Sequence, residues 1–576
     1  MQRLGLSTGA RAVLVAALLL SGGCATLAPD QPPTPIDLPA VCARLNGLTI
    51  EAERIGADTG VGSGPATITE AMFEPATLLS VAPRGPTPAA RINPALPPHC
   101  RVMGRIAPVN RGSPDILFRV NLPLDWNGRL LQYGGGGFNG VLIPATGLVP
   151  GQPYDKPTAL ARGFVTVGTD SGHQNKPNEP VQAFALDEEA LINFAHASYK
   201  KVRDVAVEIV RRAYGRPPAK LYFAGSSEGG REALVMAQRY PAAFDGVYAR
   251  VPVINWTGLQ HAGLRDGLAV AEGGWMNAEQ TRLVHDAVLV ACDELDGLRD
   301  GIVADPVRCR ERFDPATLTC GRPTAGPPPN GCLTEAQVRA IRTLWSPFVM
   351  PFPLAHGVTR YPGRGPSGEG IPASGPTGGW GSWWLGEAPP DFPPAAPPKN
   401  SIAWYYGAGA IQYFYARDPK LDVRRYDPLA HRERVLHVSA LMDGTNPDLS
   451  AFHARGGKLI LLEYLADYAQ SPYAGIEYFE SVERLMGKDR VAEFARLYVA
   501  PNVDHVGTGA PALVDMLDVL VDWVERGRPP GPLTVLEQEE KEPFRVLRAR
   551  PLCRWPEVPR YVGGDPNRAD SFQCRS

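Results

Sequence analysis

One serine lies in a pattern typical of nucleophilic catalysis. Residues 225–229 read Gly-Ser-Ser-Glu-Gly, which matches the G-x-S-x-G nucleophile elbow. The apolar, aromatic run at 221–224 predicts a β-strand, and residues 231–240 have the composition of a helix that ends at Pro241. A tight turn between them would present the Ser227 hydroxyl at a helix N-terminus, where the helix dipole favours developing negative charge. The pattern therefore predicts that Ser227 attacks a carbonyl carbon.

A glycine-rich stretch upstream could supply the oxyanion hole that this nucleophile needs. Residues 130–133 predict a strand that leads directly into residues 134–140, Gly-Gly-Gly-Gly-Phe-Asn-Gly. Backbone N–H groups of such a loop can approach a substrate oxygen closely. A P-loop is disfavoured because no Gly-Lys-Ser/Thr follows. A plain flexible turn remains an alternative.

An acid and a base follow two later strands. Residues 458–462 and 497–500 are strand-like, and Asp467 and His505 come shortly after them. Open α/β sheets place their sites just beyond the carboxyl ends of parallel strands. Either residue alone could be an ordinary surface residue, but the order Ser, Asp, His is that of α/β-hydrolases. We therefore predict an α/β fold with a catalytic triad completed by Asp467 and His505.

The composition is that of a globular protein with long loops. The chain has 576 residues, of which 44% are hydrophobic and 20% charged, with a formal net charge of −2. This balance gives no basic field for nucleic acid, so no nucleic-acid partner is expected. The 61 glycines and 59 prolines indicate long connections around a buried core.

The N-terminus has the features of an export signal. Arg3 and Arg11 precede the apolar stretch 12–20, which is too short to span a membrane as a mature helix. Small residues then lead to Cys24, as in a bacterial lipoprotein signal, although Leu20 lies one place earlier than usual. Residues 1–24 are therefore predicted to be a signal peptide with possible lipidation at Cys24, and residues 25–40 a Pro-rich tether. Cleavage by an ordinary signal peptidase is the alternative.

The cysteine count agrees with export. Nine cysteines are present, and without Cys24 the number is even, which in an exported chain predicts four disulfides. Eight cysteines allow 105 pairings, so the count alone does not choose among them. The absence of any C-x-x-C pair leaves zinc and thioredoxin chemistry without support. The eight are Cys42, Cys100, Cys292, Cys309, Cys320, Cys332, Cys553 and Cys574.

Together these motifs resemble the tannase/feruloyl esterase family over roughly residues 42–574. The branch closest in motifs is the one that hydrolyses mono(2-hydroxyethyl) terephthalate, on the strength of residues 227–232 and 382–386. The resemblance implies an α/β-hydrolase core interrupted by a large lid. The segments that carry it are 134–140, 169–173, 225–231, 238–241 and 292–309, with Asp467 and His505; the implied parts are core 41–255, lid domain 256–446 and core 447–576.

The resemblance also implies roles within the site. Ser227 would be the nucleophile, His505 the general base and then acid, and Asp467 the residue that orients the imidazole. The N–H groups of Gly137 and Glu228 would bind the oxyanion.

Structural features are implied as well. Residues 292–302 resemble the family's calcium loop, in which carboxylates on a tight turn suit a hard cation. The implied Ca²⁺ ligands are the side chains of Asp293, Asp296 and Asp300 with the carbonyls of Leu298 and Ile302. The implied disulfides are Cys42–Cys100, Cys292–Cys309, Cys320–Cys332 and Cys553–Cys574.

The chain departs from the family pattern in two places. Family members carry a disulfide between the residue before the nucleophile and the residue after the base, but here these are Ser226 and Val506. We expect activity without this bond, with His505 held less firmly. The lid arginine that holds a terephthalate carboxylate is also missing, because Lys399 is the only cation between Gly386 and Trp404.

The sequence thus predicts an exported serine carboxylesterase for esters of aromatic acids. Feruloyl or other hydroxycinnamoyl, galloyl and terephthalate-monoester acyl groups are the candidates, and Trp256, Trp383 and Trp404 could wall their pocket. The expected partner is a small aromatic ester, with membrane attachment only through lipid on Cys24. A general short-chain esterase and a non-catalytic envelope lipoprotein that retains the fold are the alternatives.

Overall fold

The structure is a computed structural model that describes residues 37–83, 90–321, 331–371 and 379–576. The predicted signal peptide, Cys24 and most of the predicted tether lie outside these residues. Only the end of the tether is described, and there the helix α1 (Leu38–Leu45) already begins before residue 40. From Leu38 to Ser576 the chain forms one compact unit.

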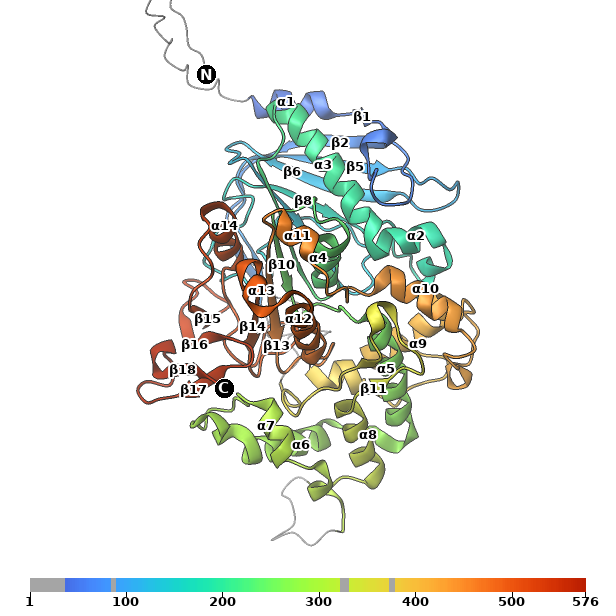
Figure 1. Cartoon of the computed structure of the whole chain (residues 1–576), viewed down its shortest axis with the longest axis vertical. Coiled ribbons are helices and arrows are strands. Elements are labelled where there is room, and N and C mark those ends of the chain that lie inside the picture. The colour runs from blue at the N-terminus through green and yellow to red at the C-terminus, as the bar shows by residue number, and fades with distance from the viewer. Residues whose placement is uncertain (1–36, 84–89, 322–330, 372–378) are drawn as a thin grey trace, which may run out of the picture. The chain divides into compact units, whose positions relative to one another are not determined.

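A twelve-stranded sheet forms the centre of this unit (Figure 1). Its six middle strands, β8, β7, β9, β10, β13 and β14, are parallel, and antiparallel strands extend both edges. This agrees with the α/β fold expected from the sequence. In sheet order the strands are β1 (Thr49–Ile50), β2 (Ala66–Glu74), β5 (His99–Ile106), β6 (Ile116–Pro123), β8 (Val165–Thr169), β7 (Arg129–Tyr133), β9 (Lys220–Ser226), β10 (Gly246–Arg250), β13 (Lys458–Tyr464), β14 (Ala495–Ala500), β16 (Val546–Arg554) and β15 (Leu533–Gln538).

Three two-stranded ribbons lie outside the main sheet. They pair β3 (Ser80–Pro83) with β4 (Ala90–Asn93), β11 (Phe348–Val349) with β12 (Arg360–Tyr361), and β17 (Val558–Tyr561) with β18 (Phe572–Arg575). The remaining α-helices are α2 (Glu188–Ile192), α3 (Ser198–Tyr214), α4 (Glu228–Arg239), α5 (Trp256–Ala269), α6 (Ala278–Cys292), α7 (Pro306–Arg312), α8 (Glu335–Trp345), α9 (Ile402–Ala410), α10 (Arg432–Met442), α11 (Ser450–Ala454), α12 (Pro472–Met486), α13 (Lys488–Phe494) and α14 (Met516–Arg526).

Helices bury both faces of the parallel strands. Alternate side chains of a strand point to opposite faces, so Tyr222 of β9 packs in the cluster that contains α14, and Phe223 packs in the cluster that contains α4 and α12. A strand that is buried on both faces needs apolar residues at consecutive positions. This requirement explains the continuous apolar runs that identified β9, β13 and β14 in the sequence.

The chain leaves the sheet between two adjacent strands. β10 and β13 are parallel neighbours, with Gly246 opposite Lys458, although residues 251–457 separate them in the sequence. This long excursion contains the helices α5 to α11, several of which gather at one end of the sheet in Figure 1. The predicted lid, 256–446, begins at the first residue of α5, and its limits remain a prediction.

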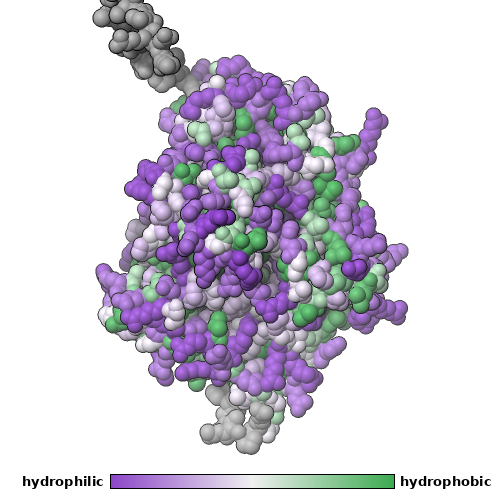
Figure 2. Space-filling view, viewed as in Figure 1, coloured by the Kyte–Doolittle hydropathy of each residue, from purple (hydrophilic) through white to green (hydrophobic). Residues whose placement is uncertain are grey.

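All four implied disulfides are present. They join Cys42 to Cys100, Cys292 to Cys309, Cys320 to Cys332 and Cys553 to Cys574. The pairing expected from the family resemblance is therefore confirmed. In the described segments, no helix has both the length and the apolar character needed to cross a membrane. Hydrophilic residues predominate on the face shown in Figure 2, where hydrophobic residues occur in small groups.

Candidate active site

The nucleophile elbow has the strained geometry that its motif predicts. Ser227 lies between β9 and α4 with φ 61° and ψ −124°, a backbone conformation that residues other than glycine rarely adopt. A Cβ atom at Gly225 would lie 2.0 Å from the carbonyl oxygen of Gly229, and one at Gly229 would lie 2.6 Å from that of Gly135. The two glycines are thus required because backbone segments meet on both sides of the serine.

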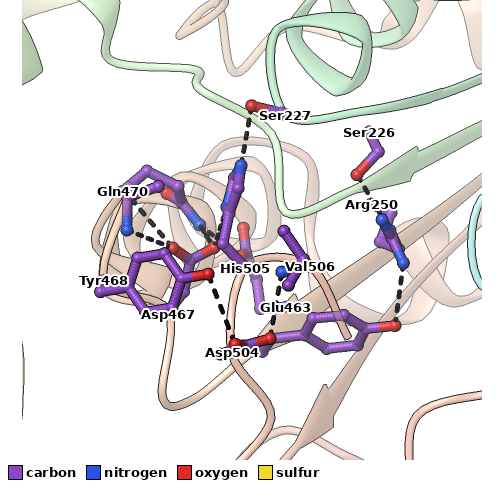
Figure 3. Close-up of polar contacts among 12 residues, drawn as sticks. Ser226, Ser227, Arg250, Glu463, Asp467, Tyr468, Gln470, Asp504, His505 and Val506 are labelled. Atoms are coloured by element: carbon purple, nitrogen blue, oxygen red, sulfur yellow. Dashed lines mark hydrogen bonds and ion pairs between the residues drawn. The ribbon is translucent and has the colours of Figure 1, made fainter. Parts of the chain in front are cut away.

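The three predicted triad residues form one hydrogen-bonded chain (Figure 3). His505 Nε2 lies 2.9 Å from Ser227 Oγ, and His505 Nδ1 lies 2.7 Å from Asp467 Oδ2. The other Asp467 oxygen accepts hydrogen bonds from the backbone N–H groups of Ala469 and Gln470, at 2.8 and 3.0 Å. These donors fix the carboxylate, which in turn sets the plane of the imidazole.

Sheet topology brings these distant residues together. Ser227 follows β9, Asp467 follows β13 and His505 follows β14, each just beyond the carboxyl end of its strand. These strands are parallel and lie in the order β9, β10, β13, β14, so their carboxyl ends open at one edge of the sheet.

The glycine-rich loop lies beside the nucleophile. Gly137 and Glu228, the expected oxyanion-hole residues, line the same pocket as Ser227. Glu232 of α4 holds the loop in place, because its carboxylate accepts hydrogen bonds from Gly135 N at 2.9 Å and Asn139 Nδ2 at 2.5 Å. Sequence reasoning gave Glu232 no role. Its position one turn after Glu228 on the elbow helix was the available signal.

The pocket beside Ser227 is small and mostly apolar. Its volume is about 210 Å³, and Trp256 and Trp383 line it as expected. The ring of Trp383 stands edge-to-face with the His505 imidazole, at 5.9 Å between centroids. The other lining residues are Gly137, Phe138, Ser227, Glu228, Val253, Leu259, Gln260, Tyr406, Ala469 and His505.

Trp404 does not line this pocket, contrary to our expectation. Its side chain is fully buried between lid helices, where a Cβ atom at Gly267 would lie 2.3 Å from the indole ring. The indole N–H donates to the carbonyl oxygen of Asp391 at 3.2 Å. Trp404 therefore belongs to the packing of α9 against α5.

The described pocket lining includes no cationic side chain. Its one charged residue is Glu228, whose carboxylate accepts a hydrogen bond from Arg231 Nε at 2.7 Å. Lys399, the cation noted in the lid sequence, pairs with Asp391 at 2.9 Å and is not part of the lining. A substrate carboxylate would therefore find no ion-pair partner among these residues.

A larger cavity of about 740 Å³ lies elsewhere, and its described lining falls within residues 275–398 of the predicted lid. Its described lining includes His285 and Glu369 but no triad residue. The larger cavity is thus separate from the predicted triad, which borders the smaller pocket.

The acidic loop of the lid is ordered by its own backbone. Asp293 accepts hydrogen bonds from Asp300 N at 3.2 Å and Gly301 N at 3.1 Å, and Asp300 also pairs with Arg550 at 2.6 Å. Burial, together with Asp300 and Asp293, raises the pKa of Asp296 to about 6. Among the described residues, no three Asp, Glu, His or Cys side chains converge in a metal-binding group. In this arrangement the predicted calcium ligands are neighbours but do not form a closed coordination shell.

The chain is similar to known esterases over most of its length. The family model of tannase and feruloyl esterase matches residues 100–575. The chain belongs to the tannase and feruloyl esterase family. An uncharacterized esterase of Agrobacterium fabrum is 34% identical over 94% of each chain. The mono(2-hydroxyethyl) terephthalate hydrolase of Piscinibacter sakaiensis is also 34% identical, over 87% of this chain and 88% of its own.

Solved structures support the same fold. The crystal structure of feruloyl esterase B from Aspergillus oryzae superposes with a TM-score of 0.72 at 22% identity, over 93% of this chain and all of that one. Membership of the family makes this chain a carboxylic ester hydrolase of the tannase and feruloyl esterase type. The core is that of an α/β-hydrolase.

Proposed function

We propose that this esterase acts through a serine acyl-enzyme. The observation that carries the proposal is the chain from Asp467 through His505 to Ser227, with contacts of 2.7 and 2.9 Å. In this arrangement the imidazole Nδ1–H donates to Asp467, and Nε2 accepts the hydroxyl proton of Ser227.

The reaction would proceed in two halves. Ser227 Oγ attacks the ester carbonyl carbon while His505 takes its proton, and the carbonyl electron pair moves to the oxygen facing the N–H groups of Gly137 and Glu228. The intermediate then releases the alcohol, which takes the proton from the imidazolium. Water, deprotonated by His505, attacks the acyl-enzyme, releases the acid and restores the Ser227 hydroxyl.

The proposed substrates are esters of neutral aromatic acids. A cavity of about 150 Å³ can hold benzene, so the pocket volume of about 210 Å³ suits one substituted ring. Phe138, Trp256 and Trp383 offer aromatic surface, while Gln260 and Tyr406 provide the polar groups to bind ring hydroxyls. The lack of a lining cation favours feruloyl or galloyl esters over a terephthalate monoester.

We propose further that the protein is exported and binds calcium. Four disulfides are typical of chains that fold in an oxidising compartment, which supports the predicted signal peptide. For calcium, the support is electrostatic, because a cation beside Asp296 would offset the repulsion among this carboxylate, Asp293 and Asp300.

A panel of esters tests the function. Purified protein and Ser227→Ala would be assayed on methyl ferulate, methyl gallate, the hydroxyethyl monoester of terephthalate and nitrophenyl acetate. We expect turnover of a neutral aromatic methyl ester that vanishes in Ser227→Ala, with much weaker turnover of the terephthalate monoester. Preference for the acetyl ester would favour a general short-chain esterase, and a folded, inactive wild type would contradict the proposal.

A further inference from the structure

Arg250, the last residue of β10, lies beside the triad without an ion-pair partner. Its side chain is partly buried, and within the described part of the chain no carboxylate lies within ion-pair distance of its guanidinium. Removing a cation from water without a paired charge costs free energy, so such residues are uncommon. The groups around the Arg250 guanidinium indicate its role.

The guanidinium faces the nucleophile elbow on one side. Arg250 is the direct register partner of Ser226 across β9 and β10, and its Nε donates to Ser226 Oγ at 2.9 Å (Figure 3). The backbone carbonyl of Arg250 also accepts a hydrogen bond from Ser227 N at 3.0 Å. The side chain of Arg250 thus binds Ser226, and its backbone carbonyl binds Ser227.

The other side of the guanidinium faces the loop that carries the base. A Cβ atom at Gly507 would lie 3.6 Å from Arg250 Nη1, so at this residue the loop leaves no more room than one side-chain carbon beside the guanidinium. Tyr464 completes the contact, because its hydroxyl lies 3.4 Å from Nη1 and its ring lies 5.4 Å from the guanidinium carbon. These contacts offset part of the cost of the unpaired charge.

The base loop, residues 504–508, is held together by hydrogen bonds that link Gly507 to the segment carrying His505. The carboxylate of Asp504 accepts hydrogen bonds from the backbone N–H groups of Val506, Gly507 and Thr508, at 3.1, 2.9 and 2.7 Å. Asp504 therefore closes a tight turn that begins one residue before the imidazole. A group that holds Gly507 also holds His505.

We propose that Arg250 is a positioning residue that holds the base loop against the nucleophile elbow. It connects Ser226, beside the nucleophile, to Gly507, two residues after the base, and so keeps Nε2 of His505 within reach of Ser227. The inference rests on the proposed triad mechanism. It differs from the expectation that His505 is loosely held in this chain, because the Arg250 side chain here fills the space between the two loops.

Three variants test the proposal. Arg250→Met keeps the chain length and removes the guanidinium, Arg250→Lys keeps the charge, and Arg496→Met is the matched control. Arg496 is a buried arginine that, like Arg250, has no ion-pair partner among the described residues, but it packs on Trp523 of α14, away from the triad. Each variant would be assayed for kcat and KM on a neutral aromatic methyl ester, and for its melting temperature.

We expect Arg250→Met to lower kcat roughly 10- to 100-fold with KM within about twofold of wild type, because misplacement of the base affects the chemical step. Arg250→Lys should recover part of kcat, and Arg496→Met should keep it even if its melting temperature falls. A folded Arg250→Met enzyme with wild-type kcat, a loss confined to KM, or an equal loss in Arg496→Met would overturn the proposal. If Arg250→Met does not fold, Arg250→Lys must show a reduced kcat.

A second readout does not depend on activity. Amide hydrogen exchange at Val506, Gly507 and Thr508 reports opening of the base loop, and it should be faster in Arg250→Met than in wild type and Arg496→Met. Unchanged exchange in Arg250→Met would contradict the proposed positioning role of Arg250. If the wild type hydrolyses no ester but the exchange difference is present, the proposed function fails while the structural role of Arg250 stands.

Discussion

The triad and the acidic loop of the lid show opposite relations between sequence and geometry. Ser227 and His505 are 278 residues apart in the chain, yet their reacting atoms lie 2.9 Å apart. Asp293, Asp296 and Asp300 lie within eight residues, yet they do not converge into a metal-binding group among the described side chains. Convergence at the triad is imposed by neighbouring parallel strands, whereas the acidic loop is arranged by its own turns and by contacts with Arg550 and Arg560.

This difference predicts where a single substitution has the greatest effect. At the triad every side chain is already in position, so replacing one carboxylate oxygen of Asp467 by an amide nitrogen should strongly reduce activity. We expect Asp467→Asn to lower kcat by roughly 10⁴-fold with an unchanged fold, because the amide favours the wrong imidazole tautomer. Steady-state kinetics measure the loss. A decrease of less than tenfold would contradict the assigned role of Asp467.

At the acidic loop the expected effect is on stability. If calcium closes this loop, a chelator should lower the melting temperature, since a ligand at a hundredfold excess over its Kd contributes about 2.7 kcal/mol. Metal-free protein would be melted with and without added Ca²⁺, and Asp296→Asn would be the control that no longer responds. Identical melting of wild type in both conditions would exclude a calcium site here.

Between these two extremes lies a contact that joins the acid and base loops. The Tyr468 hydroxyl donates to Asp504 Oδ2 at 3.3 Å, and Asp504 precedes the base. We expect Tyr468→Phe to lower kcat about two- to tenfold, which corresponds to the loss of one hydrogen bond. Tyr498→Phe is a suitable control, because this buried hydroxyl has no hydrogen-bond partner in the described structure. Equal kcat values for the two variants would remove Tyr468 from the positioning contacts.

The smallest effect is expected at the buried acid behind the triad. Burial, with a contribution from Asp467, raises the pKa of Glu463 well above its usual value, so the folded state favours the protonated carboxyl. The unfolded chain ionises this group at its ordinary pKa, and the free energy of unfolding therefore falls as the pH rises above that value. Glu463→Gln should keep kcat and gain melting temperature relative to wild type, more at pH 8 than at pH 5. A gain that shrinks with rising pH would contradict this assignment.

The sequence predicted those parts of the fold in which local pattern and tertiary environment agree. The apolar runs of β9, β13 and β14 were evident because strands buried on both faces must be apolar at consecutive positions. The elbow was evident because only glycine fits where its backbone segments meet. The four disulfide pairs came from family resemblance, since the cysteine count alone leaves 105 pairings.

Other features depend on packing between distant segments and were not accessible in this way. Trp404 resembles a pocket residue in sequence, but α5 covers it. Arg250 is the last residue of an ordinary strand, and it lies near Gly507 only because the segments at the ends of β10 and β14 come together in the fold. Glu232 shapes the glycine-rich loop from a helix nearly a hundred residues later. Each of these roles is set by tertiary contacts rather than by a local motif.

In the proposed mechanism, Ser227 carries the acyl group between the two halves of the reaction. The most direct test is to mix the enzyme with a neutral aromatic methyl ester, quench with acid within milliseconds to seconds, and measure the mass of the intact protein and its peptides. We predict an added mass equal to one acyl group on the peptide that contains Ser227, absent in Ser227→Ala. Ester turnover without this adduct, and with activity retained in Ser227→Ala, would contradict the mechanism.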